Sequence, residues 1–469
     1  MNALPRRQFL RRAACGFGGL ALNAMLAETA RAAANPLAPV LPQFPAKAKR
    51  VIFLFMAGGP SQHDLFDYKP RLEKDHGQRL GLSKNPMPFP VGTEKFLTLG
   101  PMAKFAPRGQ SGMVISDLLP HLHTVADDIC LLRGMKADNA AHDLASLQFH
   151  TGSFNDVRPS MGAWVSYGLG TENASLPSFI SIQAASDVRT YGSAFLPAAH
   201  QGTVIAGVPA DAKTPAIRFL QDPNAKPGLQ RRQMDLVQSM NRRLLGKVEH
   251  DAQMEGMVQA FELAFRMQAA TPKLVDLSSE SKAALDLYGV NNPACGKNAR
   301  ACLLARRLSE AGVRFVQVTL DGWDHHGDIR GNLPKSAAGS DQPCAALIKD
   351  LKQRGLLDDT LVLWSGEFGR TPWSQDLSGT APIEKHGREH QPDSFCAWMA
   401  GGGIKGGFTH GETDELGYQI VDGRVHVHDL HATILHQLGI NHERLTYRHS
   451  GRDFRLTDVY GEVVREILA

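Results

Sequence analysis

The chain has 469 residues, of which 43% are hydrophobic, and its 51 basic and 47 acidic residues give a formal net charge of +4. Residues 1 to 32 hold five arginines and one glutamate, so the rest of the chain is neutral, with 46 residues of each sign. A neutral chain without a stripe of Lys and Arg gives no support for nucleic-acid binding. The length allows two or three average domains, but no linker-like stretch divides the chain.

The first 32 residues have the parts of an export signal in order. The sequence PRRQFLRR is followed by a small, apolar run from Ala13 to Ala27 and then by Ala30-Arg31-Ala32. An arginine pair, a short apolar core and a small-residue exit are typical of a twin-arginine signal peptide. The apolar run is too short and too rich in glycine to span a bilayer. We therefore expect a protein without a membrane span that is periplasmic or secreted.

Five cysteines follow the predicted signal peptide. An odd, scattered set of this kind is no disulfide framework, even in an oxidising compartment. We expect mostly buried free thiols, with only one plausible local pair, Cys295 and Cys302.

Strand-like apolar runs alternate with helical segments from residue 50 onward, after an extended Pro- and Ala-rich arm over residues 33 to 49. This alternation predicts an α/β fold over residues 50 to 469, with a mostly parallel sheet flanked by helices. Helices are expected at Lys297–Ala311 and Asp341–Arg354. Strands are expected at Val51–Met56, Ile129–Leu132, Phe179–Ile182, Arg314–Leu320, Thr360–Trp364 and Phe395–Met399.

Residues 228 to 300 are predicted to be a helical insertion in this domain. Apolar residues recur at helical spacing between Gly228 and Ala270, which indicates a pair of packed helices. We expect the arginines of this pair to form its solvated face: Arg231, Arg232, Arg242 and Arg243.

The densest group of metal-capable side chains follows the fourth predicted strand. The sequence VRFVQVTLDGWDHHG contains Asp321, Asp324, His325 and His326. In open α/β sheets, ligands bind outside the carboxyl ends of the strands. Carboxylates and imidazoles suit zinc, manganese or iron. The alternative is a turn at Asp321, a helix cap at Asp324 and solvated histidines.

Polar residues also follow two other predicted strands. The first strand ends in MAGGPSQHDLFDYKP, where two glycines and a proline allow a sharp turn that presents Asp64. The alternative there is a plain turn with an Asp helix cap. The fifth strand is followed by SGEFGRTP, which places Glu367 between glycines and Arg370 beyond them. Because glutamate is rarely buried unless it is paired or binds a metal, we predict a functional role for Glu367.

Histidines near two further strands complete the candidate site. The sixth strand is preceded by HGREHQP, which places His390 at the sheet edge. The segment DNAAHDLASLQFHTGSF after the second strand predicts a helix that bears His142 and ends in a Thr-Gly pair. Asp138 or Asn139 is expected to cap this helix.

Several of these motifs resemble a bacterial protein family. The segments GGPSQHDLFDYKP, GWDHHG, SGEFGRTP, GREHQP and AGGGIKGG are similar to those of the twin-arginine-exported family named for domain of unknown function 1501. This resemblance covers nearly all of residues 50 to 469. The order of the acids and histidines also resembles that of the alkaline phosphatase and sulfatase superfamily, which implies an alkaline phosphatase-like fold.

The superfamily resemblance implies roles for single residues. Asp64 resembles the first metal-binding acid, Glu367 the later acid and His390 the final histidine. Asp321 or Asp324, with His325 or His326, resembles the Asp-x-x-x-His pair of the superfamily.

Two departures from the superfamily pattern bear on activity. Glu367-Phe368 stands where the superfamily has Asp-His, which removes one ligand. His142 stands at the position of the nucleophile. Either His142 acts as a nucleophile or a ligand, or water attacks directly, or the site no longer turns over.

The resemblance implies an exported metal-dependent hydrolase of phosphate or sulfate esters, acting on a small anionic ester or a surface polysaccharide. The expected cofactor is a divalent ion: zinc, manganese or calcium. The alternative is a catalytically silent binding or scaffold protein that retains the fold. The expected metal ligands are Asp64, Asp324, His325, His326, Glu367 and His390, and the expected catalytic residues are His142 and Arg370, the latter pairing with the anionic group.

Overall fold

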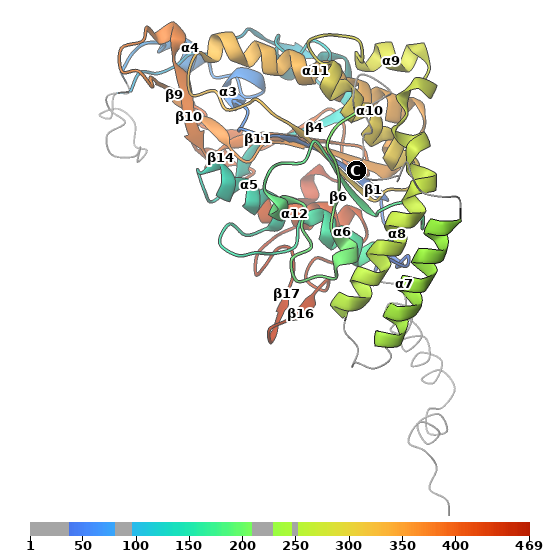
Figure 1. Cartoon of the computed structure of the whole chain (residues 1–469). Coiled ribbons are helices and arrows are strands. Elements are labelled where there is room, and N and C mark those ends of the chain that lie inside the picture. The colour runs from blue at the N-terminus through green and yellow to red at the C-terminus, as the bar shows by residue number, and fades with distance from the viewer. Residues whose placement is uncertain (1–36, 80–95, 209–227, 246–251) are drawn as a thin grey trace, which may run out of the picture.

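The computed structural model describes residues 37–79, 96–208, 228–245 and 252–469 (Figure 1). The predicted signal peptide therefore lies outside the described residues. A nine-stranded sheet has the order β12-β4-β11-β8-β1-β7-β5-β6, and β15 also pairs with β4. Only β11 is antiparallel to its neighbours in the described sheet. The strands are β1 (Arg50–Met56), β4 (Ile129–Lys136), β5 (Phe179–Ile182), β6 (Thr203–Ile205), β7 (Phe315–Leu320), β8 (Thr360–Ser365), β11 (Phe395–Ala400), β12 (Phe408–His410) and β15 (Val425–His426).

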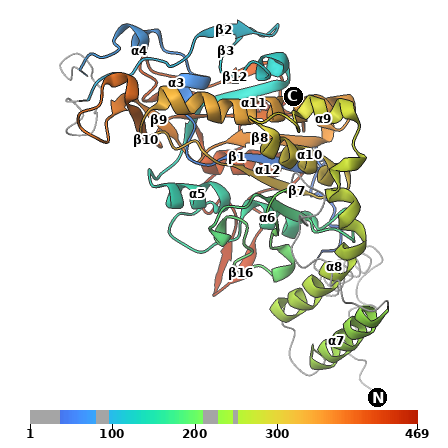
Figure 2. The ribbon, with the colours of Figure 1, turned by 45° about the horizontal axis from the view of Figure 1, so that its top comes forward.

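The sheet is buried on both faces because alternate residues of its strands point into two hydrophobic clusters. Ile52 and Leu54 of β1 belong to the cluster that includes α10 and α11, whereas Phe53 and Phe55 belong to the cluster that includes α5, α6 and α12. Figures 1 and 2 show these helices on opposite sides of the sheet. The predicted α/β class, with a mostly parallel sheet flanked by helices, is therefore confirmed. The helices are α5 (His142–Thr151), α6 (Met161–Leu169), α9 (Lys282–Tyr288), α10 (Gly296–Glu310), α11 (Ile329–Gln353) and α12 (Val427–Gln437).

All six predicted strands are present, and most of their ends agree with the sequence pattern to within one residue. The exception is β4, which continues four residues beyond its apolar run to Lys136. Met135 pairs with both Phe395 of β11 and Val425 of β15. Pairing with two neighbours therefore extends this strand beyond what its composition predicts.

Of the two predicted helices, α10 is confirmed, but the predicted start of α11 at Asp341 is wrong. The helix begins at Ile329 and contains two prolines, Pro334 and Pro343. The Asp341 carboxylate accepts hydrogen bonds from the backbone amides of His121 and Leu122, at 2.7 and 2.8 Å. It therefore satisfies the backbone of another segment instead of capping its own helix.

Residues 228 to 300 contain the helical pair α7 (Leu229–Leu245) and α8 (Ala252–Val275), followed by α9 and the start of α10. No helix in the described ranges combines the length and apolar character that crossing a bilayer requires. The five cysteines after the signal region are buried and free, as predicted. Smaller elements are α3 (Gln62–Leu65), α4 (Pro70–Lys74) and the two-stranded ribbons β2 (Phe105–Arg108) with β3 (Met113–Ser116), β9 (Gly369–Gln375) with β10 (Gly387–Gln391), β13 (Glu412–Thr413) with β14 (Ile420–Asp422), and β16 (Tyr447–His449) with β17 (Arg452–Phe454).

Candidate metal centre

The central parallel strands β8, β1 and β7 are neighbours, so their carboxyl ends lie at one edge of the sheet. Glu367 follows β8, Gly58 follows β1 and Asp324 follows β7. The backbone amide of Gly58 donates hydrogen bonds to both carboxylate oxygens of Glu367, at 3.0 and 3.2 Å. The loops after adjacent strands are thereby joined at the place where the sequence predicts a site.

Glycine is required where the loop after β1 meets the loops after β7 and β8. Gly58 has a φ of +115°, and a Cβ there would lie 2.5 Å from the backbone nitrogen of Asp324. A Cβ on Gly59, with a φ of +72°, would lie 2.7 Å from the ring of Phe368. Only a residue without a side chain allows this close approach.

Two further elements bring histidines to the same edge. Strands β9 and β10 form an antiparallel ribbon in which His390 is the register partner of Arg370. His142 is the first residue of α5, the helix that follows β4. Residues far apart in the sequence therefore meet beside the loop after β7.

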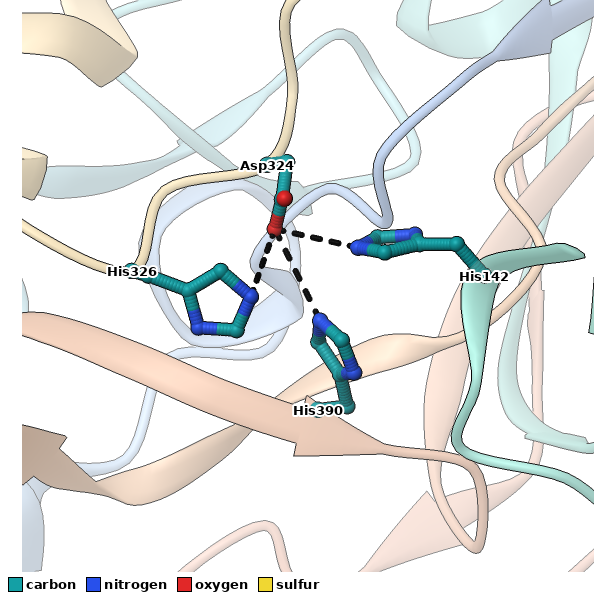
Figure 3. Close-up of side chains that lie close together, drawn as sticks. All are labelled: His142, Asp324, His326 and His390. Carbon is teal, nitrogen blue, oxygen red and sulfur yellow. Dashed lines mark ion pairs between the residues drawn. The ribbon is translucent and has the colours of Figure 1, made fainter.

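His142, Asp324, His326 and His390 form the one group of potential metal ligands found in the described part of the chain (Figure 3). Their ligand atoms all lie within 4.8 Å of one another. The Oδ1 atom of Asp324 lies 3.1 Å from Nε2 of His142, 2.9 Å from Nε2 of His326 and 3.6 Å from Nε2 of His390. Figure 3 shows the three rings pointing their Nε2 edges toward this carboxylate.

Acceptors behind two of the rings determine where each ring carries its proton. His142 Nδ1 lies 2.6 Å from Oε1 of Glu367, and His390 Nδ1 lies 2.6 Å from the carbonyl oxygen of Ala140. Because a carboxylate and a carbonyl can only accept, both Nδ1 atoms must donate. The lone pair of each neutral ring is then on Nε2, the atom that faces the group.

The third ring is held in the same way. Nδ1 of His326 contacts the side-chain oxygen Oε1 of Gln375. The orientation of this amide is fixed because its Nε2 donates to Oε2 of Glu389 at 2.5 Å. All three imidazoles therefore have a hydrogen-bond acceptor behind Nδ1, as metal-ligating histidines usually do.

The geometry of the group fits a divalent ion. Nε2 of His142 and Nε2 of His390 are buried and have no hydrogen-bond partner within the described residues. In a tetrahedral site with bonds of about 2.0–2.1 Å, neighbouring ligand atoms lie about 3.3 Å apart. The separations of 2.9 to 3.6 Å from Asp324 bracket that spacing.

The charges around Asp324 favour its ionised form. Burial acts to raise its pKa, but the hydrogen bond and charge of Arg370, with the nearby His142 and His326, outweigh burial and lower the pKa to about 2. For His142, burial acts to lower the pKa, but the hydrogen bond and charge of Glu367 raise it overall. Burial, followed by the charge of Arg370, lowers the pKa of His390 to about 4.

Arg370 is fully buried behind Asp324. Its Nη2 lies 2.6 Å from Oδ1 of Asp324. Its guanidinium also donates to the backbone carbonyls of Gly58, Gly59 and Arg388. Arg370 thus holds the carboxylate and two loops together, and its pairing with a substrate anion stays a prediction.

Glu367 is only 1% exposed, so the sequence argument that it must be paired is supported. Its partner is the Nδ1 atom of His142 and not the group of four ligand atoms. The following residue, Phe368, packs against the rings of His142 and His390, with centroid distances of 4.9 and 4.5 Å. The Glu-Phe pair that departs from the superfamily pattern therefore orients two of the histidines.

Asp64 lies apart from the group, in a closed ion pair. Nε of Arg388 lies 2.8 Å from Oδ2 of Asp64, and neither side chain has any exposed area. The Ser61 hydroxyl and the Met102 amide also donate to the Asp64 carboxylate, at 2.5 and 2.8 Å. The acid that resembles the first metal ligand of the superfamily is thus occupied by hydrogen bonds within the protein.

Adjacent residues of the GWDHHG motif have different surroundings. His326 joins the group, whereas Nε2 of His325 lies 3.2 Å from the hydroxyl of Ser336. Burial lowers the pKa of His325 to about 4, so this ring is neutral. Asp321 is exposed and lies outside the group. Of the pairs that the sequence left open, the structure brings together Asp324 and His326.

Some contributors to the site have no signal in the sequence. Ala140 contributes only a carbonyl oxygen, and Gln375 ends a strand that the sequence had not indicated. The predicted cap of α5 is wrong: Ala141 occupies the N-cap position without a side-chain hydrogen bond. Asn139 instead accepts from the amide of Ala141 at 2.8 Å, in the turn that places the Ala140 carbonyl beside His390.

Solved structures of several enzymes are similar to this chain. The lipoteichoic acid synthase LtaP from Listeria monocytogenes is 10% identical, with a TM-score of 0.37, over 93% of this chain and 81% of that chain. The PsFucS1 sulfatase from Pseudoalteromonas sp. is 11% identical, with a TM-score of 0.38, over 90% and 72%. The alkaline phosphatase from the Antarctic bacterium TAB5 is 9% identical, with a TM-score of 0.30, over 84% and 97%. At identities this low, the likeness concerns the fold alone.

Sequence comparison gives a stronger result at the level of the family. A search among curated proteins found no match. The family model described as "Protein of unknown function (DUF1501)" matches residues 48–468. Because this match covers almost all of the chain after the predicted arm, the chain belongs to the DUF1501 family.

Proposed function

We propose that this chain is an exported metal-dependent hydrolase of phosphate or sulfate esters. The observation that supports this proposal most strongly is the convergence of three imidazole Nε2 atoms on the Asp324 carboxylate, with an acceptor behind each Nδ1. Buried nitrogens without hydrogen-bond partners are costly unless they bind something. No group of the described residues donates a hydrogen bond to Nε2 of His142 or of His390, and a cation would fit the lone pairs of these two atoms.

The donor set favours zinc, manganese or iron over calcium. Calcium takes six to eight oxygen ligands, whereas this group offers three nitrogens and one carboxylate. Phe368 stands where the resemblance would place another ligand, and Asp64 is paired with Arg388. We therefore infer a site for a single ion.

A divalent ion held there would act as a Lewis acid toward an ester oxygen and would lower the pKa of water in contact with it from 15.7 to about 7. The residues of the chain prepare the site for this chemistry. Glu367 keeps the proton of His142 on Nδ1, and Arg370 keeps Asp324 ionised. The Asp324 side chain is 45% exposed, so an ester in solution has access to the group.

Attack by water accounts for the arrangement better than a covalent intermediate. The four converging residues include no serine, threonine or cysteine. Nδ1 of His142 is hydrogen-bonded to Glu367, and its Nε2 points at Asp324. This is the arrangement of a histidine that binds a metal through Nε2. We therefore assign His142 to the metal group and not to the role of nucleophile.

The activity is tested with aryl phosphates, phosphodiesters and aryl sulfates, each with zinc, manganese, iron, calcium or magnesium. Hydrolysis is expected with a transition metal and is expected to be lost in His326→Ala. The matched control is His325→Ala, one residue away, which lies outside the group and should keep most of the rate. If every combination fails while metal is shown to be bound, the hydrolase proposal is wrong and the chain is a metal-binding scaffold.

Export by the twin-arginine route is part of the same proposal and rests on the sequence of residues 1 to 32. Replacement of Arg6 and Arg7 by lysine should retain the precursor in the cytoplasm, because the arginine pair is the signal that the route reads. Cell fractionation with an antibody to the folded domain measures this. A mature form in the periplasm of the double variant would refute the assignment.

A further inference from the structure

The helical pair α7 and α8 projects from the body at the end away from β9 and β10 (Figures 1 and 2). Leu263 and Met267 of α8 are buried in a cluster with Leu37 and Ala199 of the body. Both views place α7 on the outer side of α8. α8 is therefore the helix that attaches the pair, and α7 is its outermost element.

Two contacts define which side of α7 faces α8. The buried side chain of Gln238 donates to the carbonyl oxygen of Val258 at 3.1 Å. The guanidinium of Arg231 lies 5.5 Å from the ring centroid of Phe265. Both partners belong to α8, so the side of α7 that carries Arg231 and Gln238 is its inner side.

The opposite side of α7 carries an apolar stripe. Leu229, Leu236 and Met240 recur at helical spacing on one line, half a turn away from Gln238. They are 46%, 61% and 60% exposed, respectively. The structure leaves these three residues, here called the α7 stripe, exposed to solvent. Large apolar residues gathered on one exposed face indicate a binding surface.

The charges beside the α7 stripe are positive. Arg232 and Arg243 are exposed and lie along one edge of the stripe. Asp235 is the one acidic residue in the sequence of α7, and it pairs with Arg231 at 2.8 Å, away from the stripe. An apolar line bordered by arginines is the pattern of a helix that lies in the plane of a membrane surface.

A second copy of the chain fits this surface less well. When two helices pair along apolar seams, the residues that border one seam face those that border the other. Arg232 and Arg243 would then face the same arginines of the second helix, without an acidic residue of α7 to offset them. An anionic bilayer offers phosphates to these arginines and an apolar layer to the stripe.

We propose that the α7 stripe docks on a bilayer that contains anionic phospholipid, with Leu229, Leu236 and Met240 inserted at the level of the head groups and Arg232 and Arg243 at the phosphates. This peripheral attachment is independent of the metal centre. It leaves the loops of the candidate site at the opposite end of the molecule.

Co-sedimentation with vesicles tests this proposal, using the protein recovered after export with its N-terminal sequence determined. Vesicles of phosphatidylcholine with phosphatidylglycerol should bind the protein, and vesicles of phosphatidylcholine alone should bind it weakly. Leu236→Gln/Met240→Gln should weaken binding about tenfold or more, because it removes two inserted side chains. Arg232→Gln/Arg243→Gln should weaken binding and reduce its dependence on salt.

Leu377→Gln is the matched control, because Leu377 is 71% exposed in the loop between β9 and β10, and it should bind as the wild type does. Equal binding by wild type and the stripe variants would overturn the proposal. A dimer in solution that Leu236→Gln/Met240→Gln dissociates, without vesicle binding, would assign the stripe to a second copy. A melting temperature lowered by several degrees in that variant would show that the stripe packs within the chain, which also overturns the proposal.

Discussion

Two carboxylates at the ends of adjacent strands have opposite surroundings. Asp64, after β1, forms an ion pair with Arg388 in which both side chains are 0% exposed. Asp324, after β7, also contacts an arginine, Arg370, at 2.6 Å, but it is 45% exposed and faces three imidazoles. The carboxylate of Asp64 is fully engaged in contacts that hold loops together, whereas the carboxylate of Asp324 is accessible to a ligand.

This comparison shows that a strand-end acid is not by itself a ligand. What distinguishes the two acids is the set of donors around them. Asp64 receives hydrogen bonds from a hydroxyl and a backbone amide in addition to its arginine. The neighbours of Asp324 are histidines whose protons lie on the far nitrogen, so they offer lone pairs and not donors.

The largest effect is expected for Asp64→Ala. Removing this carboxylate leaves the buried Arg388 without its counter-ion, which should lower the free energy of unfolding by about 3–5 kcal/mol. Urea unfolding followed by circular dichroism measures the loss. Asp64→Ala/Arg388→Met should recover much of it, because the double variant removes the unpaired charge. If Asp64→Ala were as stable as the wild type but no longer bound metal, the roles assigned to the two acids would be reversed.

The second effect concerns two histidines of the core, His150 and His431. Burial lowers the pKa of His150 to about 4 and that of His431 to about 3. Below pH 6.5 the unfolded chain binds protons on these rings that the folded chain excludes. The stability that depends on His150 is therefore present above pH 6.5 and is lost as the pH falls toward 4, by about 3 kcal/mol in total.

The test of this pH effect is urea unfolding of wild type and His150→Phe between pH 7 and pH 4.5. The phenylalanine keeps an aromatic ring beside Phe53 and Phe55 but cannot bind a proton. Its stability should depend on pH less steeply than that of the wild type. Parallel curves for the two proteins would show that His150 does not contribute.

A smaller effect is expected for Glu367→Gln, which weakens the acceptor behind His142 without removing a ligand. Loss of such a partner typically lowers metal affinity about 10- to 100-fold. Competition with a chelator measures this affinity. Asp321→Asn is the control, because Asp321 is exposed and lies outside the group of four ligands. Equal affinities for wild type and Glu367→Gln would remove the orienting role of Glu367.

The smallest effect on stability is expected for Asp324→Asn in the metal-free protein. The asparagine keeps a side-chain oxygen that can accept from Arg370, and the Asp324 side chain is 45% exposed, so the loss should be within about 1.5 kcal/mol. The same urea experiment measures it. A loss as large as that of Asp64→Ala would show that Asp324 is also a structural acid and would erase the contrast between the two.

The sequence predicts the sheet and the edge at which the site lies, because buried strands and the polar residues after them are local patterns. The polar residues after β1, β7 and β8 lie at the carboxyl ends of these strands, as the sequence pattern predicts, and Glu367 is buried there. The sequence leaves open which acid and which histidine of GWDHHG take part. That choice depends on the turn after β7, which directs His326 inward and His325 toward Ser336.

Partners distant in the sequence explain the rest of the difference. Asp64 and Arg388 are separated by 324 positions, and no local pattern shows that they pair. The ribbon of β9 and β10 places His390 beside Arg370, although the first of these strands has no apolar run. The exposed face of α7 is likewise set by the contacts of α7 with α8.

The most direct test of the metal centre is a calorimetric titration of the metal-free protein with zinc, carried out on wild type, His326→Ala and His325→Ala. We predict that wild type and His325→Ala bind about one ion per chain with similar affinity, and that His326→Ala binds about tenfold more weakly or worse. Binding that is absent from all three proteins, or the same in all three, would contradict a metal centre formed by His142, Asp324, His326 and His390.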